Sequence, residues 1–283
     1  MPTSKKVEIA QENLSSANRF KEEGKLDEAL SLYEQVLKAI PKNAVALRQM
    51  ADIYETQENW EQAASTYQKL VALRSDNASI YQKLGNALKE TGDVDGSISA
   101  YKSAIALNPE QPFRLYLNVA KTLSEQDRTD DEIEAYRKLV ELKPTSAKFQ
   151  TQLGDLLQKK GNLDEAATCF ERALAIHQET KPEATTRYYV KLGAIHLKQG
   201  HPDEAIASYQ KALNIKPELV AAHRGLGDAL GQKGSYDDAI RCYQKVNELK
   251  PDNAGLFRAI GDVMLRQGRD TEALDYYRRA IAL

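Results

Sequence analysis

The chain has 283 residues, of which 42% are hydrophobic and 28% charged, and its formal net charge is −2. This composition excludes a disordered chain, and the small net charge argues against nucleic acid or an anionic membrane surface as a partner. No stretch approaches the roughly 18 apolar residues of a transmembrane helix, and residues 1–13 lack the apolar core of a signal peptide. We therefore expect a cytoplasmic protein with no membrane insertion.

In chain order, a unit of 34 residues recurs from near the N-terminus to the last residue. The eight repeats are 10–43, 44–77, 78–111, 113–146, 147–180, 186–219, 220–253 and 254–283. Each contains two apolar patterns of helical period separated by a turn. Length alone would suggest about two globular domains, but an array of repeats grows by adding neighbours.

Four positions of the repeat explain this architecture. Position 8 is always Gly or Ala, which lets the two helices approach closely, and position 24 is always aromatic, which fills the groove between helices. Position 15 is Gly in six repeats, and supplies the left-handed backbone that ends the first helix, with Glu58 and Asp127 as exceptions. Proline at position 32, as in Pro251, ends the second helix in most repeats.

These residues resemble the tetratricopeptide repeat, whose pattern appears in Leu226-Gly227, Leu230, Ala239, Tyr243 and Pro251 and at equivalent places elsewhere. The resemblance implies an all-α fold, an α-solenoid of stacked antiparallel helix pairs that forms a right-handed superhelix. The first helices would line a concave groove.

Departures from the pattern predict local irregularities. Glu132 replaces the usual small residue at position 20, and we expect it to be partly solvated.

The domains are then a tail at 1–9, repeats one to five at 10–180, an insertion at 181–185, and repeats six to eight at 186–283. The insertion should extend the preceding helix or add a loop, and divide the array into five repeats and three.

The last repeat ends at Leu283 without a polar capping helix. Terminal repeats normally carry a polar outer face. We therefore expect Leu256, Ile260, Tyr277 and Ile281 to be uncovered, in a fragment of a longer protein or in one that self-associates through this repeat.

No catalytic constellation, metal site or cofactor motif appears in the sequence. Cys169 and Cys242 occupy the same position two repeats apart, which predicts two free thiols. His196 and His223 occupy packing positions between helices. The chain is not predicted to be an enzyme.

The groove remains as the candidate site. In the family the inward residues lie at positions 2, 5, 6, 9, 12 and 13, and here basic residues outnumber acidic ones at these positions. Either these charges are only solvated, or they hold an extended acidic peptide. A subset resembles the two-carboxylate clamp of chaperone-binding relatives, with Gln82 and Gln152 where that clamp needs cations. The candidate peptide-binding residues are Gln82, Lys83, Asn86, Asn118, Lys121, Lys148, Gln152 and Lys191.

The sequence therefore predicts a scaffold that binds a protein or peptide ligand in its groove. The alternative is the substrate-recruiting arm of a larger enzyme of the glycosyltransferase type. Members of that kind line the groove with an asparagine ladder at position 6, but Asn118 is the single asparagine at this position here.

Overall fold

The computed structural model describes residues 4–109, 112–251 and 253–283, and within them the chain is built from α-helices joined by short turns. The chain divides into two compact units, residues 1–139 and 140–283. The helices of the first are α1 (Ser4–Glu22), α2 (Leu26–Ala39), α3 (Ala44–Thr56), α4 (Trp60–Leu73), α5 (Ala78–Glu90), α6 (Val94–Leu107), α7 (Phe113–Ser124) and most of α8 (Thr129–Leu142).

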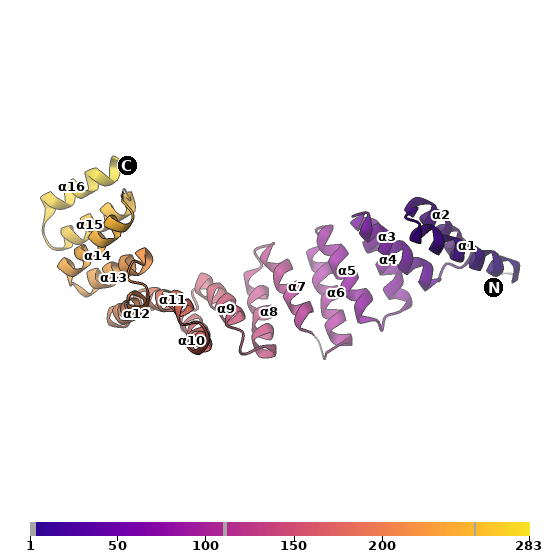
Figure 1. The fold of residues 1–283 in the computed structure, drawn as a ribbon, viewed down its shortest axis with the longest axis horizontal. Coiled ribbons are helices and arrows are strands. Elements are labelled where there is room, and N and C mark those ends of the chain that lie inside the picture. The colour runs from indigo at the N-terminus through magenta and orange to yellow at the C-terminus, as the bar shows by residue number, and fades with distance from the viewer. Residues whose placement is uncertain (1–3, 110–111, 252) are drawn as a thin grey trace. The chain divides into compact units, whose positions relative to one another are not determined.

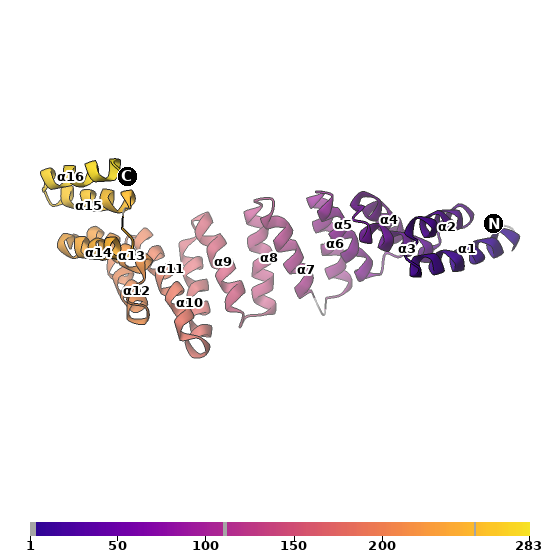
Figure 2. The same ribbon diagram turned by 45° about the horizontal axis from the view of Figure 1, so that its top comes forward.

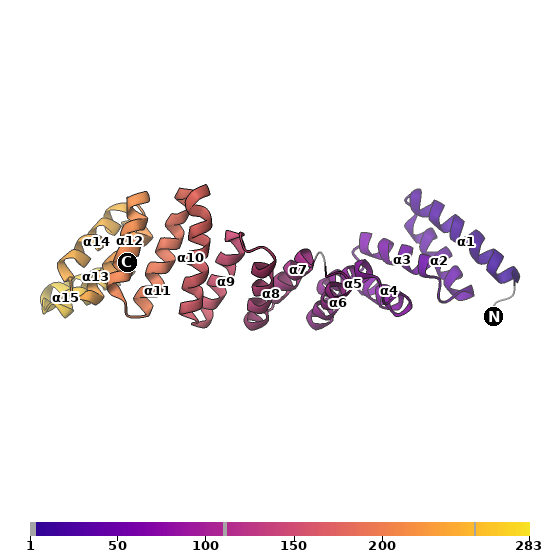
Figure 3. The same cartoon turned by 90° about the horizontal axis from the view of Figure 1, so that it is seen from below.

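The second unit contains α9 (Ala147–Lys160), α10 (Leu163–Thr180), the 3-10 helix η1 (Pro182–Thr185), α11 (Thr186–Lys198), α12 (Pro202–Ile215), α13 (Val220–Lys233), α14 (Tyr236–Leu249), α15 (Ala254–Arg266) and α16 (Asp270–Ile281). Within each unit successive helices follow chain order (Figure 1). Pairs such as α1–α2, α13–α14 and α15–α16 pack along their lengths, as the turned views show (Figures 2 and 3). The prediction of an all-α array of helix pairs is confirmed for the described residues.

The last residue of several repeats caps the first helix of the next repeat. Asn43, Asn77 and Asn253 at position 34 accept hydrogen bonds from backbone N–H groups in the first turn of the following helix. Such caps satisfy donors that have no partner within the helix. Other helices, such as α2, α9 and α13, begin without a side-chain cap.

The small residue at position 8 lets the first helix of a repeat lie close to the aromatic ring at position 24 of the second helix, as the sequence predicts. A Cβ added to Gly85 would lie 2.6 Å from the Tyr101 ring, and one added to Gly227 would lie 2.6 Å from the Tyr243 ring. Both tyrosines are almost fully buried, so their rings form the centre of the helix–helix contact.

Several local expectations change. The first helix begins at Ser4, so residues 4–9, expected as part of a tail, are helical, while residues 1–3 lie outside the described part. Glu132 is buried, with 7% of its surface exposed, and not partly solvated, because the turn keeps the ordinary register and places it against the first helix. His196 and His223 are half-buried and are not core residues.

α10 ends at Thr180, before the insertion, and the inserted residues Pro182–Thr185 form the 3-10 helix η1, where an extension of the preceding helix or a loop was expected. The boundary between the two compact units falls within α8, and α10, η1 and α11 pack together in the second unit. The expected division of the array into five repeats and three stays a prediction.

In the last repeat Leu256 and Ile260 are buried, because α14 and α16 pack on α15 and cover them. The expectation that they are uncovered is wrong. Tyr277 is half-buried, and Ile281 is 85% exposed. No helix of the described residues is long and apolar enough to cross a membrane.

Candidate functional site

A hydrogen bond joins the two helices of most repeats on the face assigned to the groove. The tyrosine hydroxyl at position 24 of the second helix donates to the side chain at position 9 of the first. The pairs are Tyr33–Asn18 (2.7 Å), Tyr67–Asp52 (3.2 Å), Tyr101–Asn86 (2.8 Å), Tyr243–Asp228 (2.7 Å) and Tyr277–Asp262 (2.8 Å). Burial raises the pKa of Tyr33 and Tyr101 to about 12, so the hydroxyls stay protonated and remain donors. Each tyrosine thus fixes the orientation of an acid or amide in the groove.

Lysine side chains join neighbouring repeats on the same face. Lys83 contacts Asp52 (2.7 Å) and Glu55 (2.8 Å) of the preceding repeat. Burial acts to lower the pKa of Lys83, but the hydrogen bonds that its ammonium donates to both carboxylates outweigh burial and leave the pKa raised. Lys191 contacts Asp155 in the same way, at 2.5 Å. Two of the cations predicted to hold an acidic ligand are therefore already paired with carboxylates of the chain.

Three of the predicted residues line one pocket of the first unit, of about 450 Å³, which we call the Trp60 pocket. Its lining combines an indole, amides and charges: Glu55, Trp60, Asn86, Lys89, Glu90, Tyr101, Asn118 and Lys121. The residues come from three consecutive repeats. The structure therefore places Asn86, Asn118 and Lys121 together, as their inward positions in the repeat predict.

The polar side chains of the Trp60 pocket differ in how many hydrogen bonds and ion pairs they already make within the chain. Asn86 accepts the Tyr101 hydroxyl through Oδ1, which leaves its Nδ2 donors available. Lys89 pairs with Glu125 at 3.0 Å. Asn118 and Lys121 have no side-chain hydrogen bond or ion pair with other described residues. The pocket can therefore donate to a backbone carbonyl through its amides and to an anion through Lys121.

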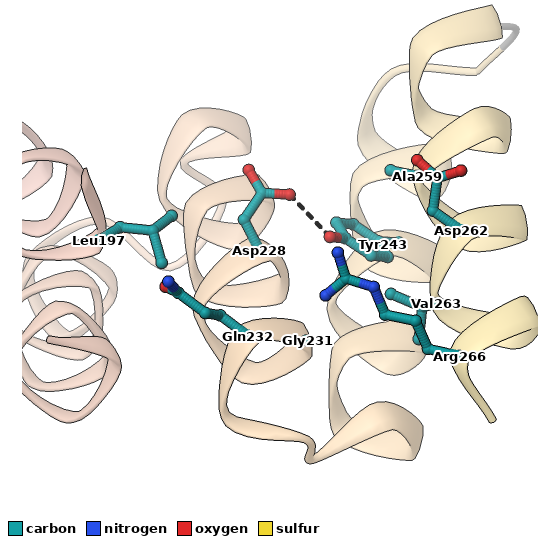
Figure 4. Close-up of a pocket in the computed structure, with 9 residues that line it drawn as sticks. All are labelled: Leu197, Asp228, Gly231, Gln232, Tyr243, Ala259, Asp262, Val263 and Arg266. Carbon is teal, nitrogen blue, oxygen red and sulfur yellow. Dashed lines mark hydrogen bonds between the residues drawn. The ribbon is translucent and has the colours of Figure 1, made fainter. Parts of the chain in front are cut away.

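The second unit contains a pocket at equivalent repeat positions, of about 330 Å³, which we call the Asp228 pocket (Figure 4). It is lined by Leu197, Asp228, Gly231, Gln232, Tyr243, Ala259, Asp262, Val263 and Arg266. Ala259 and Asp262 stand where the Trp60 pocket has Asn118 and Lys121. The Asp228 pocket therefore has an alanine and a carboxylate where the Trp60 pocket has Asn118 and Lys121, and its own amide and cation, Gln232 and Arg266, stand at another repeat position.

Burial raises the pKa of the Asp228 carboxyl, although the hydrogen bond from Tyr243 and the nearby charge of Arg224 act to lower it. In Figure 4 the Asp228 carboxylate and the Tyr243 hydroxyl face each other across the pocket. The sequence prediction missed this pocket, because a search for basic residues passed over a groove segment rich in aspartate. The regular recurrence of Tyr at position 24 with Asp or Asn at position 9 was the available signal.

The remaining predicted residues do not join these pockets. Gln82 is half-buried in the first unit, and Lys148 and Gln152 are exposed on α9 of the second. Lys83 and Lys191 are held in the ion pairs described above. The clamp-like set thus falls into two parts, one in each unit.

The part of the chain that the structure describes contains no group of three or more His, Cys, Asp or Glu placed to hold a metal ion. Cys169 and Cys242 are free thiols, as predicted, and burial raises the pKa of Cys242.

Known proteins share this repeat. The family model described as Cilia and flagella-associated protein 70 C-terminal domain matches residues 114–283, and two tetratricopeptide-repeat models match residues 21–88 and 78–111. The solved structure of MamA protein is 30% identical with a TM-score of 0.51, over 63% of this chain and 94% of MamA.

Two further proteins bear on function. YrrB, described as a TPR protein with an unusual peptide-binding site, is 25% identical with a TM-score of 0.51, over 65% of this chain and 92% of YrrB. Human Protein O-mannosyl-transferase TMTC1 is 23% identical over 56% of this chain and 18% of its own length. The chain spans only 6% to 18% of the curated relatives it matches. From its helix pairs, its repeat signature and these matches, the chain is a tetratricopeptide-repeat protein and belongs, through residues 114–283, to the family described as Cilia and flagella-associated protein 70 C-terminal domain.

Proposed function

We propose that this chain is a protein-interaction scaffold that binds an extended, acidic peptide segment, and that the Trp60 pocket is the place where it binds. The observation that carries the proposal is the convergence of Asn86, Asn118 and Lys121 on one pocket beside the only tryptophan. Amide donors suit a peptide backbone, and an indole suits an apolar side chain. The cation adds a preference for a carboxylate.

The acidic preference rests on Lys121 more than on the summed charge of the groove. Lys83 and Lys89, which lie nearby in sequence, pair with carboxylates of the chain and add little attraction for a ligand. Lys121 has no carboxylate partner among the described residues. One unpaired ammonium supports recognition of one or two acidic residues, with an affinity that falls as salt rises.

The comparison with YrrB supports peptide binding as the class of function, since YrrB is described as having a peptide-binding site. The scaffold role agrees with the repeat architecture, which presents extended surfaces and few enclosed cavities.

The test is selection of nine-residue peptides from a random displayed library on the parent protein, followed by affinity measurement against the double variant Asn118→Ala with Lys121→Glu. We expect selected peptides to contain Asp or Glu and to bind the variant at least about tenfold more weakly, the equivalent of 1.4 kcal/mol. The matched control is Gln68→Ala with Lys69→Glu, on the exposed side of α4. A selection in which every recovered peptide binds the parent and the double variant equally would refute the site.

A second candidate is that these repeats form the recruiting arm of a larger transferase. The match to Protein O-mannosyl-transferase TMTC1, over 18% of that protein, supports this alternative. Reading the open frame beyond Leu283 tests it: a transferase domain would support the arm, and a stop codon within a few residues would exclude it.

For the location we propose the cytoplasm. The free thiols of Cys169 and Cys242 support a reducing compartment. Fractionation of cells that express a tagged chain checks this, and recovery in a secreted or luminal fraction would contradict it.

A further inference from the structure

The inserted residues 181–185 help to enclose a cavity of about 670 Å³ in the second unit, which we call the insertion pocket. It lies where the end of α10, η1 and the starts of α11 and α13 meet. Its lining includes Lys181, Arg187, Lys191 and Lys216, with Val190 and Leu219 among the apolar residues. The cavity exists at this point because α10 runs on to Thr180 before the chain turns into α11.

Charge sets this pocket apart from the rest of the groove. Glu183 is the one carboxylate among its described lining residues, against four cations. Lys191 is paired with Asp155, but Lys181, Arg187 and Lys216 have no carboxylate partner among the described residues. Elsewhere in the groove Lys83 and Lys89 are paired with carboxylates of neighbouring repeats. Three uncompensated cations therefore line this one pocket.

The partly buried polar contacts beside the pocket agree with a positive potential. Arg187 donates to the Tyr188 hydroxyl at 2.6 Å, and that hydroxyl lies 3.1 Å from Nδ1 of His177. Burial lowers the pKa of His177, and the charges of Arg187 and Lys181 lower it further. The two cations that lower the pKa of His177 are thus the same Arg187 and Lys181 that line the insertion pocket.

The lining also has an apolar part. Val190 and Leu219 are half-buried, and Ala184 and Ala221 add to the apolar lining. A free phosphate or a simple anion would leave this surface unused. An apolar side chain seated there, with carboxylates on either side of it in an extended segment, would meet both the apolar lining and the cations.

We propose that the insertion pocket binds an acidic segment of a partner protein in which carboxylate side chains flank one apolar side chain. This is a second site, on the other unit from the Trp60 pocket, and it does not depend on that pocket. The complementarity of an apolar lining with three uncompensated cations carries the assignment.

The experiment measures the anisotropy of a fluorescein-labelled pentapeptide, Glu-Glu-Leu-Glu-Glu, on titration with the full chain. Two probe controls replace the glutamates by glutamine or the leucine by alanine. The test variant carries Lys181→Gln, Arg187→Gln and Lys216→Gln. The matched control carries Arg172→Gln, Arg241→Gln and Lys250→Gln, which removes the same charge from exposed positions of α10, of α14 and of the C-cap of α14.

We expect the test variant to bind at least about tenfold more weakly, since three partly solvated charge pairs each contribute a fraction of 1.4 kcal/mol. The control variant should stay within about twofold of the parent, and both altered probes should bind more weakly. Equal losses in the test and control variants, or no loss in the test variant, would overturn the proposal.

A second variant tests whether unfolding, and not loss of the cations, causes any loss of peptide binding. Leu219 is the N-cap residue of α13, in extended backbone and without a side-chain cap. Leu219→Asp supplies a capping carboxylate and at the same time places negative charge in the pocket. It should keep its helical content and lose the acidic probe, and full binding by this variant would contradict the assignment.

Two further measurements distinguish this site from the Trp60 pocket and from a membrane-binding surface. The double variant Asn118→Ala with Lys121→Glu should bind the pentapeptide as the parent does, whereas a loss there would assign the peptide to the Trp60 pocket and overturn this inference. Cosedimentation with vesicles of anionic phospholipid is run in parallel. Vesicle binding that requires the three cations, without peptide binding, would also overturn it in favour of a membrane surface.

Discussion

At the scale of single residues, the turn between the two helices of a repeat shows why glycine recurs there. Gly24, Gly92 and Gly234 have φ of 77°, 83° and 90°, and the two exceptions, Glu58 and Asp127, have φ of 55° and 53°. The turn thus keeps its left-handed backbone even where a side chain opposes it. A Cβ in this region costs about 1–2 kcal/mol.

Glu58→Gly should therefore stabilise the chain by about 1 kcal/mol, by removing this strain. Thermal unfolding followed by circular dichroism measures the effect. The converse change, Gly234→Ala, should lower the melting temperature, because alanine would occupy a φ of 90°. A lower melting temperature for Glu58→Gly would show that the glutamate side chain contributes more than the backbone strain costs.

Asp228 gives a prediction with a pH dependence. Its pKa is raised above the ordinary 3.8, so the folded state holds this proton more tightly than the unfolded chain does. The folded state therefore loses stability as the pH rises from about 4 through the raised pKa. Asn18 and Asn86 show that an amide at this position also accepts the tyrosine hydroxyl.

Asp228→Asn should therefore be more stable than the parent at pH 7, by up to about 1 kcal/mol, with the difference shrinking as the pH falls towards 4. Urea unfolding at a series of pH values measures this. Tyr243→Phe is the companion variant: it removes the hydrogen bond that lowers this pKa, so the loss of stability with rising pH should steepen. A difference between Asp228→Asn and the parent that does not vary with pH would contradict the account.

At the scale of helices, Gly225 shows how one repeat shapes the next. Tyr209 belongs to a repeat with Ala194 at position 9, so its hydroxyl has no acceptor there. The end of its ring lies against Gly225 of α13, and a Cβ at residue 225 would overlap the ring. This contact explains why Gly225 stands where other repeats have an amide, a lysine or a small residue.

Gly225→Ala should destabilise the packing of α12 on α13 by about 1–3 kcal/mol, the usual cost of overpacking. Gly231→Ala, in the same helix, is the matched control. A Cβ at residue 231 would approach Val263 most closely, at 3.3 Å, and alanine favours the helix, so its effect should be small or stabilising. Equal effects of the two substitutions in chemical unfolding would refute the role given to Tyr209.

How much the sequence predicts also varies with scale. The small residues at position 8, the turn at position 15 and the aromatic at position 24 follow from packing within one repeat, and they predict the helix pairs well. Contacts between repeats depend on side-chain register across two helices. For that reason the pairing of Lys83 with Asp52 and Glu55 could not be read from the inward positions alone. The burial of Glu132 escaped prediction because the cost of burying a carboxylate favours a shifted turn, which the chain does not adopt.

On the scale of the whole chain, each of the two compact units carries a pocket at the same repeat positions, with different chemistry. The Trp60 pocket offers Asn118 and Lys121, and the Asp228 pocket offers Ala259 and Asp262. A ligand matched to one is therefore mismatched to the other, which is how specificity arises from a repeated fold. The repeat residues determine the fold, and the few groove residues that differ determine the ligands.

The measurement that tests this account most directly is the emission of Trp60, the only tryptophan of the chain, during titration with a peptide selected on the parent protein. We predict a saturable change in emission whose midpoint matches the affinity measured for the same selected peptide and moves to higher peptide concentration as salt rises. The change should be lost in the variant with Asn118→Ala and Lys121→Glu. With the insertion-pocket cations also replaced (Lys181→Gln, Arg187→Gln and Lys216→Gln), peptide binding that leaves Trp60 emission unchanged, or that persists undiminished with Asn118→Ala and Lys121→Glu, would contradict the central claim.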